Sequence, residues 1–110
     1  MMYPERCDIY IFRAKLYLKL KNWERAISDF RRAVQIDSSR GIAYIGQGDA
    51  FRMMAEYDEA VTAYTDAINL QSPLARIALL KRAIALTELK RYNEAICDLD
   101  AVIVFTRINN

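Results

Sequence analysis

The sequence of 110 residues is 54% hydrophobic and 27% charged, and its formal net charge is +2. Such a composition requires a buried core and excludes a disordered chain, while the small net charge gives no support for binding to nucleic acid or to an anionic membrane. Only three glycines and two prolines are present, which is too few for the many turns of a β-sandwich or a β-barrel.

Apolar residues recur with helical spacing along almost the whole chain, and they predict six helices. The expected helices cover residues 4–20, 24–37, 40–54, 58–71, 74–90 and 93–106. Pro4 suits the first turn of a helix, and Ser72 with Pro73 marks a break before the fifth helix. No segment approaches ~18 uncharged apolar residues and no signal peptide is visible, so we expect no membrane partner and a cytoplasmic protein.

The predicted helices form three sequence repeats. An aromatic residue stands directly before the second predicted helix of each repeat, and an alanine follows three residues after it. These alanines, Ala26, Ala60 and Ala95, are 34 and 35 residues apart. The positions four and seven residues later lie on the same helical face, and they hold Phe30 and Ala33, Tyr64 and Ala67, and Leu99 and Val102.

The first helix of each repeat carries a small residue followed by a large one. These pairs are Ala14 and Tyr17, Gly48 and Phe51, and Ala83 and Leu86. Antiparallel helices approach closely where one offers a small side chain and the other fills the gap. Each repeat is therefore expected to be a packed helix pair.

This spacing resembles the tetratricopeptide repeat (TPR), and the resemblance covers about residues 7–108. It implies an all-α fold: an α-solenoid of three helix-turn-helix units, whose six antiparallel helices form a right-handed superhelix. One TPR domain is expected over residues 1–110, with repeats of about 7–40, 41–74 and 76–109.

In TPR arrays the first helices of the repeats line a concave groove, and the resemblance assigns groove residues here by position. The expected partner groove consists of Ile11, Lys15, Ile42, Ile45, Asp49, Arg52, Ile77, Leu80, Lys81 and Ile84. Its aliphatic members lie opposite the small-residue seam, so we expect the chain to leave them uncovered. Because exposed apolar surface usually marks an interface, the predicted function is protein-protein interaction. The module would bind a helix or peptide in this groove, as an adaptor or scaffold.

One alternative is a structural or oligomerisation segment of a larger TPR protein with no free ligand groove. In that case a segment of the parent protein, or a second copy of the chain, fills the groove. Another alternative is single-stranded RNA binding by related helical-pair repeats, which needs base-reading polar side chains at regular positions. The aliphatic groove argues against this, so we expect no nucleic acid partner.

A subgroup of TPR domains binds the acidic C-termini of heat-shock chaperones through a clamp of lysine, asparagine and arginine residues. By position the clamp falls on Ile11, Lys15, Gly46, Ile77 and Lys81. Only two of these residues are cationic and neither asparagine is present, so a peptide carboxylate would lack most of its charge-assisted donors. We therefore expect no such clamp.

Catalytic chemistry has little support in this sequence. No histidine is present, so the cysteines and serines lack their usual base, and Cys7 and Cys97 follow no metal-ligand spacing. Glu56, Asp58 and Glu59 fall at a predicted helix start, where acidic residues favour the positive end of the dipole. We expect no enzyme activity, no catalytic residue, no metal and no cofactor.

The last predicted helix ends in five consecutive apolar residues, from Ala101 to Phe105. They surround the helix, so one partner helix cannot cover all of them, and solenoids need a polar outer face at their ends. Either the chain is a fragment of a longer array or another subunit covers this end, and we favour the first. Val104 and Phe105 are the predicted contact residues for end-to-end self-association through the C-terminal helix.

Overall fold

The computed structural model describes residues 4–108, and within them it contains six α-helices and no β-strand. The helices are α1 (Pro4–Lys19), α2 (Trp23–Ile36), α3 (Gly41–Met53), α4 (Tyr57–Asn69), α5 (Ala75–Glu88) and α6 (Tyr92–Ile108). Every predicted helix is present, and each end lies within two residues of its predicted position. The outermost residues of the predicted domain 1–110, including Asn109 at the end of the third repeat, lie outside the described residues.

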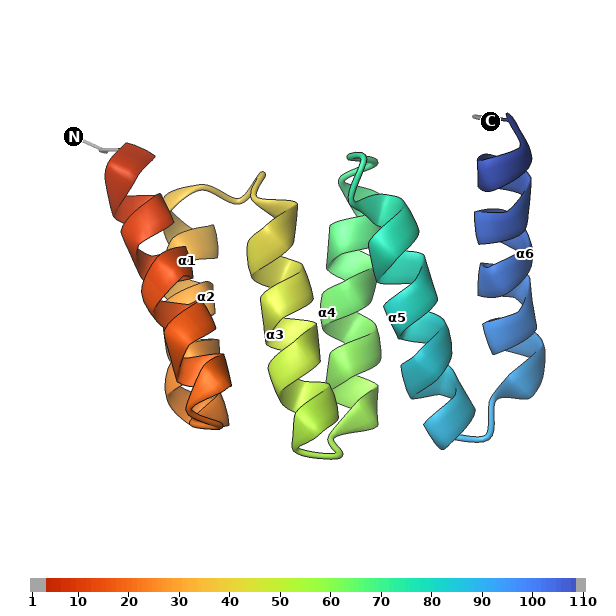
Figure 1. Cartoon of the computed structure of the whole chain (residues 1–110), viewed down its shortest axis with the longest axis horizontal. Helices are drawn as coiled ribbons and strands as arrows, with labels where there is room; N and C mark the ends of the chain where they lie inside the picture. The colour runs from red at the N-terminus through yellow and green to blue at the C-terminus, as the bar shows by residue number, and fades with distance from the viewer. Residues whose placement is uncertain (1–3, 109–110) are drawn as a thin grey trace.

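The helices stand side by side in chain order, and the two chain ends lie at opposite ends of the array (Figure 1). Each helix packs against the next one along the chain, and α3 also contacts both α1 and α5. The helices α1, α3 and α5 therefore form a row of their own. The resulting body is elongated, with extents of 42 × 30 × 19 Å.

Small residues allow the helices to approach closely. Ala14, Ala26 and Ala60 are completely buried. A methyl group at Gly48 would collide with the ring of Tyr64, and a methyl group at Gly46 would collide with the ring of Phe30. These two glycines therefore serve packing, because the aromatic rings fill the space that a side chain would need.

The two cysteines are free thiols in different surroundings. Cys7 is buried between α1 and α2, where its Sγ donates a weak hydrogen bond to the carbonyl of Ala33 at 3.4 Å. Burial raises the pKa of this thiol, so Cys7 behaves as a small, neutral core side chain. Cys97 is exposed on α6.

The turn inside each repeat closes with the same backbone hydrogen bonds. After α3, the N–H of Ala55 bonds to the carbonyl of Arg52 at 3.0 Å, and the N–H of Glu56 bonds to the carbonyl of Phe51 at 2.9 Å. This pair of bonds is a Schellman motif, which ends a helix with one left-handed residue. In the three repeats that residue is Lys21, Ala55 and Lys90, with φ of 61°, 60° and 60°.

Replacing Ala55 by glycine is expected to raise the free energy of unfolding by about 1 kcal/mol. A left-handed backbone costs a residue with a Cβ roughly 1–2 kcal/mol, and the greater freedom of glycine in the unfolded chain offsets part of that gain. Urea unfolding followed by circular dichroism measures the change. Ala101→Gly on the exposed side of α6 is the control, and it should lower stability by about 1 kcal/mol. A loss of stability in Ala55→Gly would contradict the assignment of strain to this turn.

Candidate functional site

An open depression with a volume of about 240 Å³ lies along the row formed by α1, α3 and α5, and we call it the α1–α3–α5 groove. It is lined by Lys15, Leu18, Phe30, Ile42, Ile45, Gly46, Asp49, Leu74, Ile77 and Lys81. Six of the residues predicted to bind a partner are in this lining, namely Lys15, Ile42, Ile45, Asp49, Ile77 and Lys81. The other four predicted residues, Ile11, Arg52, Leu80 and Ile84, are outside the lining.

The aliphatic residues of the predicted groove differ strongly in exposure along the array. Ile77, Leu80 and Ile84 on α5 are exposed, whereas Ile11 on α1 and Ile45 on α3 are buried. The prediction that the chain leaves all of them uncovered is therefore wrong for Ile11 and Ile45. Ile11 belongs to a core cluster that includes α3, and Ile45 belongs to one that includes α5. The first helix of each repeat thus covers the first helix of the preceding repeat. Within the described chain, no further helix covers α5 in this way.

Asp49 organises the polar side of the groove. Its carboxylate accepts a hydrogen bond from the Tyr64 hydroxyl at 2.6 Å and from the Lys81 ammonium at 2.7 Å. The Nη2 atom of Arg52 lies 3.7 Å from the same carboxylate, and Arg52 Nε donates to the Tyr64 hydroxyl oxygen at 3.2 Å. Burial, together with the bond to Asp49, raises the pKa of Tyr64. The network links α3 to α4 and α5. Together with the exposed Lys15, it gives this side of the groove a net positive charge.

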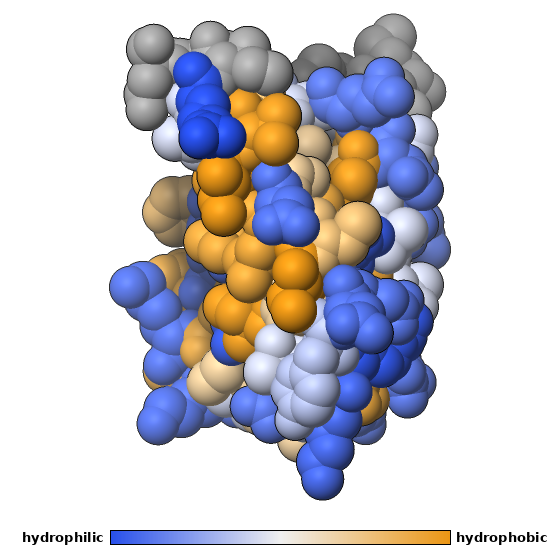
Figure 2. All heavy atoms as spheres, turned by 90° about the vertical axis from the view of Figure 1, so that its right-hand side faces the viewer, coloured by the Kyte–Doolittle hydropathy of each residue, from blue (hydrophilic) through white to orange (hydrophobic). Residues whose placement is uncertain are grey.

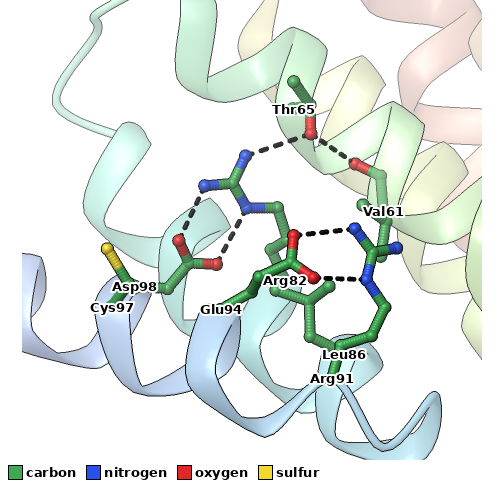
Figure 3. A pocket seen from close by; sticks show the side chains of 8 residues that line it. All are labelled: Val61, Thr65, Arg82, Leu86, Arg91, Glu94, Cys97 and Asp98. Atoms are coloured by element: carbon green, nitrogen blue, oxygen red, sulfur yellow. Dashed lines mark hydrogen bonds and ion pairs between the residues drawn. The ribbon is translucent and has the colours of Figure 1, made fainter.

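A second pocket, of about 340 Å³, lies where α4, α5 and α6 meet, and Figure 3 shows its lining. Arg82 donates to both carboxylate oxygens of Asp98, at 2.7 and 2.8 Å, and to the hydroxyl of Thr65 at 3.1 Å. Arg91 makes a similar paired contact with Glu94, which lowers the pKa of that carboxyl. The charged groups here are paired with one another, and the bonds of Arg82 link the three helices. The pocket is therefore a poor site for a ligand.

The Arg82–Asp98 pair was not predicted, although the sequence carries a signal for it. Arg13 and Asp29 are also 16 residues apart, they occupy the same repeat positions, and they form the same double hydrogen bond at 2.7 and 2.8 Å. An arginine and an aspartate that recur together in two repeats predict such a pair between the two helices of a repeat.

Both ends of the array carry exposed apolar side chains. Val104 and Phe105, predicted as end-to-end contacts, are exposed on α6, where the guanidinium of Arg76 lies 5.4 Å from the centre of the Phe105 ring. The apolar row that α1 exposes at the opposite end was not predicted. This row consists of Ile9, Phe12 and Leu16, and their spacing of three and four residues was the available signal.

Within residues 4–108 the structure contains no group of three or more side chains that could hold a metal ion. None of the helices in that range is both long enough and apolar enough to cross a membrane. The groove itself is lined by aliphatic side chains and by the paired polar network of Asp49. This lining suits the binding of apolar side chains from another molecule.

Sequence models of one family, the tetratricopeptide repeat, match residues 7–40 and 45–108. The chain is 33% identical over 60 residues to a protein SGT1 homolog from Oryza sativa subsp. japonica, and 27% identical over 101 residues to tetratricopeptide repeat protein 16 from Mus musculus. These matches cover 54% and 84% of this chain but only 16% and 13% of the two relatives. The chain therefore spans less than a fifth of the length of either relative.

Solved structures with the same architecture cover nearly the whole chain. The second TPR of Spaghetti (RPAP3), bound to the HSP90 peptide SRMEEVD, is 26% identical and superposes with a TM-score of 0.85 over 92% of this chain and 93% of its own. MamA is 19% identical, with a TM-score of 0.89 over 97% of this chain and 62% of its own. The predicted all-α solenoid of three helix pairs is confirmed by these matches and by the six helices.

Proposed function

Because this chain belongs to the tetratricopeptide repeat family, we propose that it is a protein-interaction module that binds a helix or peptide in the α1–α3–α5 groove, as a non-catalytic adaptor or scaffold. The observation that carries the proposal is the exposed aliphatic row of Ile77, Leu80 and Ile84 on α5, whose first member lines the groove. A similar array, the second TPR of Spaghetti (RPAP3), is bound to a peptide.

The energetics of burial support this proposal. Each of the three exposed aliphatic residues can contribute up to roughly 1.5–3 kcal/mol when a partner covers it, and part of the sum offsets the ordering of the partner. The residues are three and four positions apart, so they form one continuous ridge along α5. Lys15, Arg52 and Lys81 outnumber Asp49, so this side would orient a partner with an acidic group next to its apolar row.

Peptides selected from a random phage-displayed library on the native chain provide the test, with affinities measured by titration calorimetry. The double variant Ile77→Asp with Leu80→Asp should bind the selected peptides at least about tenfold more weakly, a loss of about 1.4 kcal/mol. Met53→Asp is the matched control, because Met53 is an exposed apolar side chain outside the groove lining. Unchanged affinity in the double variant, or an equal loss in the control, would place the binding site elsewhere.

The HSP90 peptide SRMEEVD is expected not to bind this chain measurably in the micromolar range. At the five clamp positions the chain supplies only Lys15 and Lys81 as cations, and the Lys81 ammonium is already 2.7 Å from Asp49. A peptide carboxylate would therefore compete with Asp49 for one of its two charged donors. Calorimetry with the second TPR of Spaghetti (RPAP3) as positive control makes the measurement, and a micromolar Kd for this chain would refute the prediction.

The second candidate function is a structural or oligomerisation segment of a larger TPR protein with no free ligand groove. Its support is the small share, 16% and 13%, that the matching region occupies in the two relatives, because such proteins use the array as one part of a longer chain.

We also propose a cytoplasmic setting for the chain, which cell fractionation tests.

A further inference from the structure

We propose that copies of this chain associate head to tail, with α6 of one copy packed on α1 of the next. Inside the chain, the second helix of one repeat packs against the first helix of the following repeat, as α2 does on α3 and α4 does on α5. The proposed contact repeats this arrangement between molecules and covers the apolar faces at both ends of the array. It is independent of what the α1–α3–α5 groove binds.

The outer face of α1 is apolar at positions that the second repeat buries against a preceding helix. One repeat later, these positions hold the buried residues Ala43, Gly46 and Ala50. In α1 they hold Ile9, Phe12 and Leu16, which are 62%, 68% and 48% exposed. Three large apolar side chains on one open helix face are the mark of a surface that is covered in an assembly.

The outer face of α6 exposes positions that are buried in α2 and α4. Phe30 in α2 and Tyr64 in α4 are 1% and 0% exposed, whereas Leu99 at the same repeat position in α6 is 38% exposed. Figure 2 looks onto this end of the molecule and shows a band of apolar side chains running down it. The exposed apolar residues of α6 include Ile96 and Ile103, which lie three and four positions from Leu99. α6 therefore offers the face that α2 and α4 use to hold the next repeat.

The charges of the two end helices favour α1 as the partner of α6. On α6, Asp98 and Glu94 are paired with Arg82 and Arg91, whereas Asp100 is exposed, and the exposed basic residues of α1 include Arg6 and Lys19. A symmetric contact between two α6 helices would place acidic side chains near each other, which costs free energy. A contact between α6 and α1 pairs opposite charges.

One ion pair can be named from the contact between the second and third repeats (Figure 3). Arg82 donates from Nη1 to the hydroxyl of Thr65 in the preceding repeat at 3.1 Å. Arg13 occupies the position of Arg82 in the first repeat, and Asp100 occupies the position of Thr65 in the third repeat. The same packing between two copies would therefore bring the Arg13 guanidinium to the Asp100 carboxylate.

The size of the side chains sets the geometry of this contact. Both end faces carry larger side chains than α3 presents to α2, so α6 and α1 would lie farther apart than α2 and α3. A head-to-tail contact does not close when two copies meet, and it therefore produces chains of copies that lengthen with concentration.

Sedimentation velocity of the native chain and of the variants Phe12→Glu and Ile103→Glu tests the proposal. The native chain should form species larger than a dimer as its concentration rises from micromolar to millimolar, and each variant alone should stay monomeric. An equimolar mixture of the two variants should form a dimer and nothing larger, because each variant keeps one intact end face. Met53→Glu, an exposed apolar position away from both end faces, should associate like the native chain.

Several outcomes would overturn the proposal. The proposal fails if the native chain stays monomeric at millimolar concentration. It also fails if the mixture of the two variants remains monomeric. Self-association of Phe12→Glu at native strength would indicate a symmetric α6 contact instead. Circular dichroism shows whether each variant folds. If Ile103→Glu does not fold, Asp100→Arg replaces it, because this variant should also weaken association. Peptide titration is a separate readout, because neither Phe12 nor Ile103 lines the groove.

Discussion

Ile45→Asp is expected to lower the free energy of unfolding by about 4 kcal/mol, whereas Leu80→Asp should lower it by less than about 1 kcal/mol. The two residues occupy the same position in successive repeats, 35 residues apart. Ile45 is 7% exposed because α5 lies over it, and Leu80 is 46% exposed because no further helix of the described chain covers it. The comparison therefore isolates the effect of that cover from the chemistry of the substitution.

The large loss in Ile45→Asp has a specific physical cause. The new carboxylate would lie among Ala60, Tyr64 and Ala78, where it either keeps an unpaired charge or takes up a proton. Burial raises the pKa of such a carboxyl, so the deficit is complete at neutral pH and shrinks as the pH falls toward about 4. Urea unfolding at pH 7 and at lower pH measures both effects. Equal losses in the two variants would show that burial at Ile45 is not what the structure indicates.

The helices and their pairing could be predicted from the sequence because they depend on local pattern. The alanines at 26, 60 and 95 and the small residues at 14, 48 and 83 recur with one spacing, and close packing explains why each is small. Local periodicity placed every helix end within two residues. The turns were harder to anticipate, because Lys21, Ala55 and Lys90 adopt a left-handed backbone where glycine would be the usual signal.

The exposure of the groove could not be predicted in the same way, because it depends on neighbouring repeats. Ile11, Ile45 and Leu80 occupy one repeat position, yet only the last is exposed. A helix pattern identifies the face to which a residue belongs, but the helix that covers this face comes from the next repeat. The same reasoning explains the missed apolar row on α1, since its positions are buried alanines and a glycine one repeat later.

Arg82→Met is expected to lower the free energy of unfolding by about 3 kcal/mol, and Arg13→Met by about 1 kcal/mol. Both arginines make a double hydrogen bond to a buried aspartate of their own repeat. The Arg13 side chain is more than half exposed, so water can replace its bonds, whereas the Arg82 side chain is largely buried between α4 and α6. The bonds to Asp98 raise the pKa of Arg82, which means that the charged form is the one held in the folded state.

The loss at Arg82 should also be local, because the hydrogen bonds of this residue hold α6 against the rest of the array. Within the described residues α6 packs against α5 alone, and Arg82 joins it to α4 through Asp98 and Thr65. Methionine preserves the length of the aliphatic stem, so the variant removes the charge and hydrogen bonds with little change in packing. Hydrogen exchange should then speed up first in α6, while in Arg13→Met it should change little in any helix. Uniformly faster exchange across all six helices in Arg82→Met would mean that α6 is held mainly by its apolar contacts with α5, and the ion pair would then contribute no more than an exposed one.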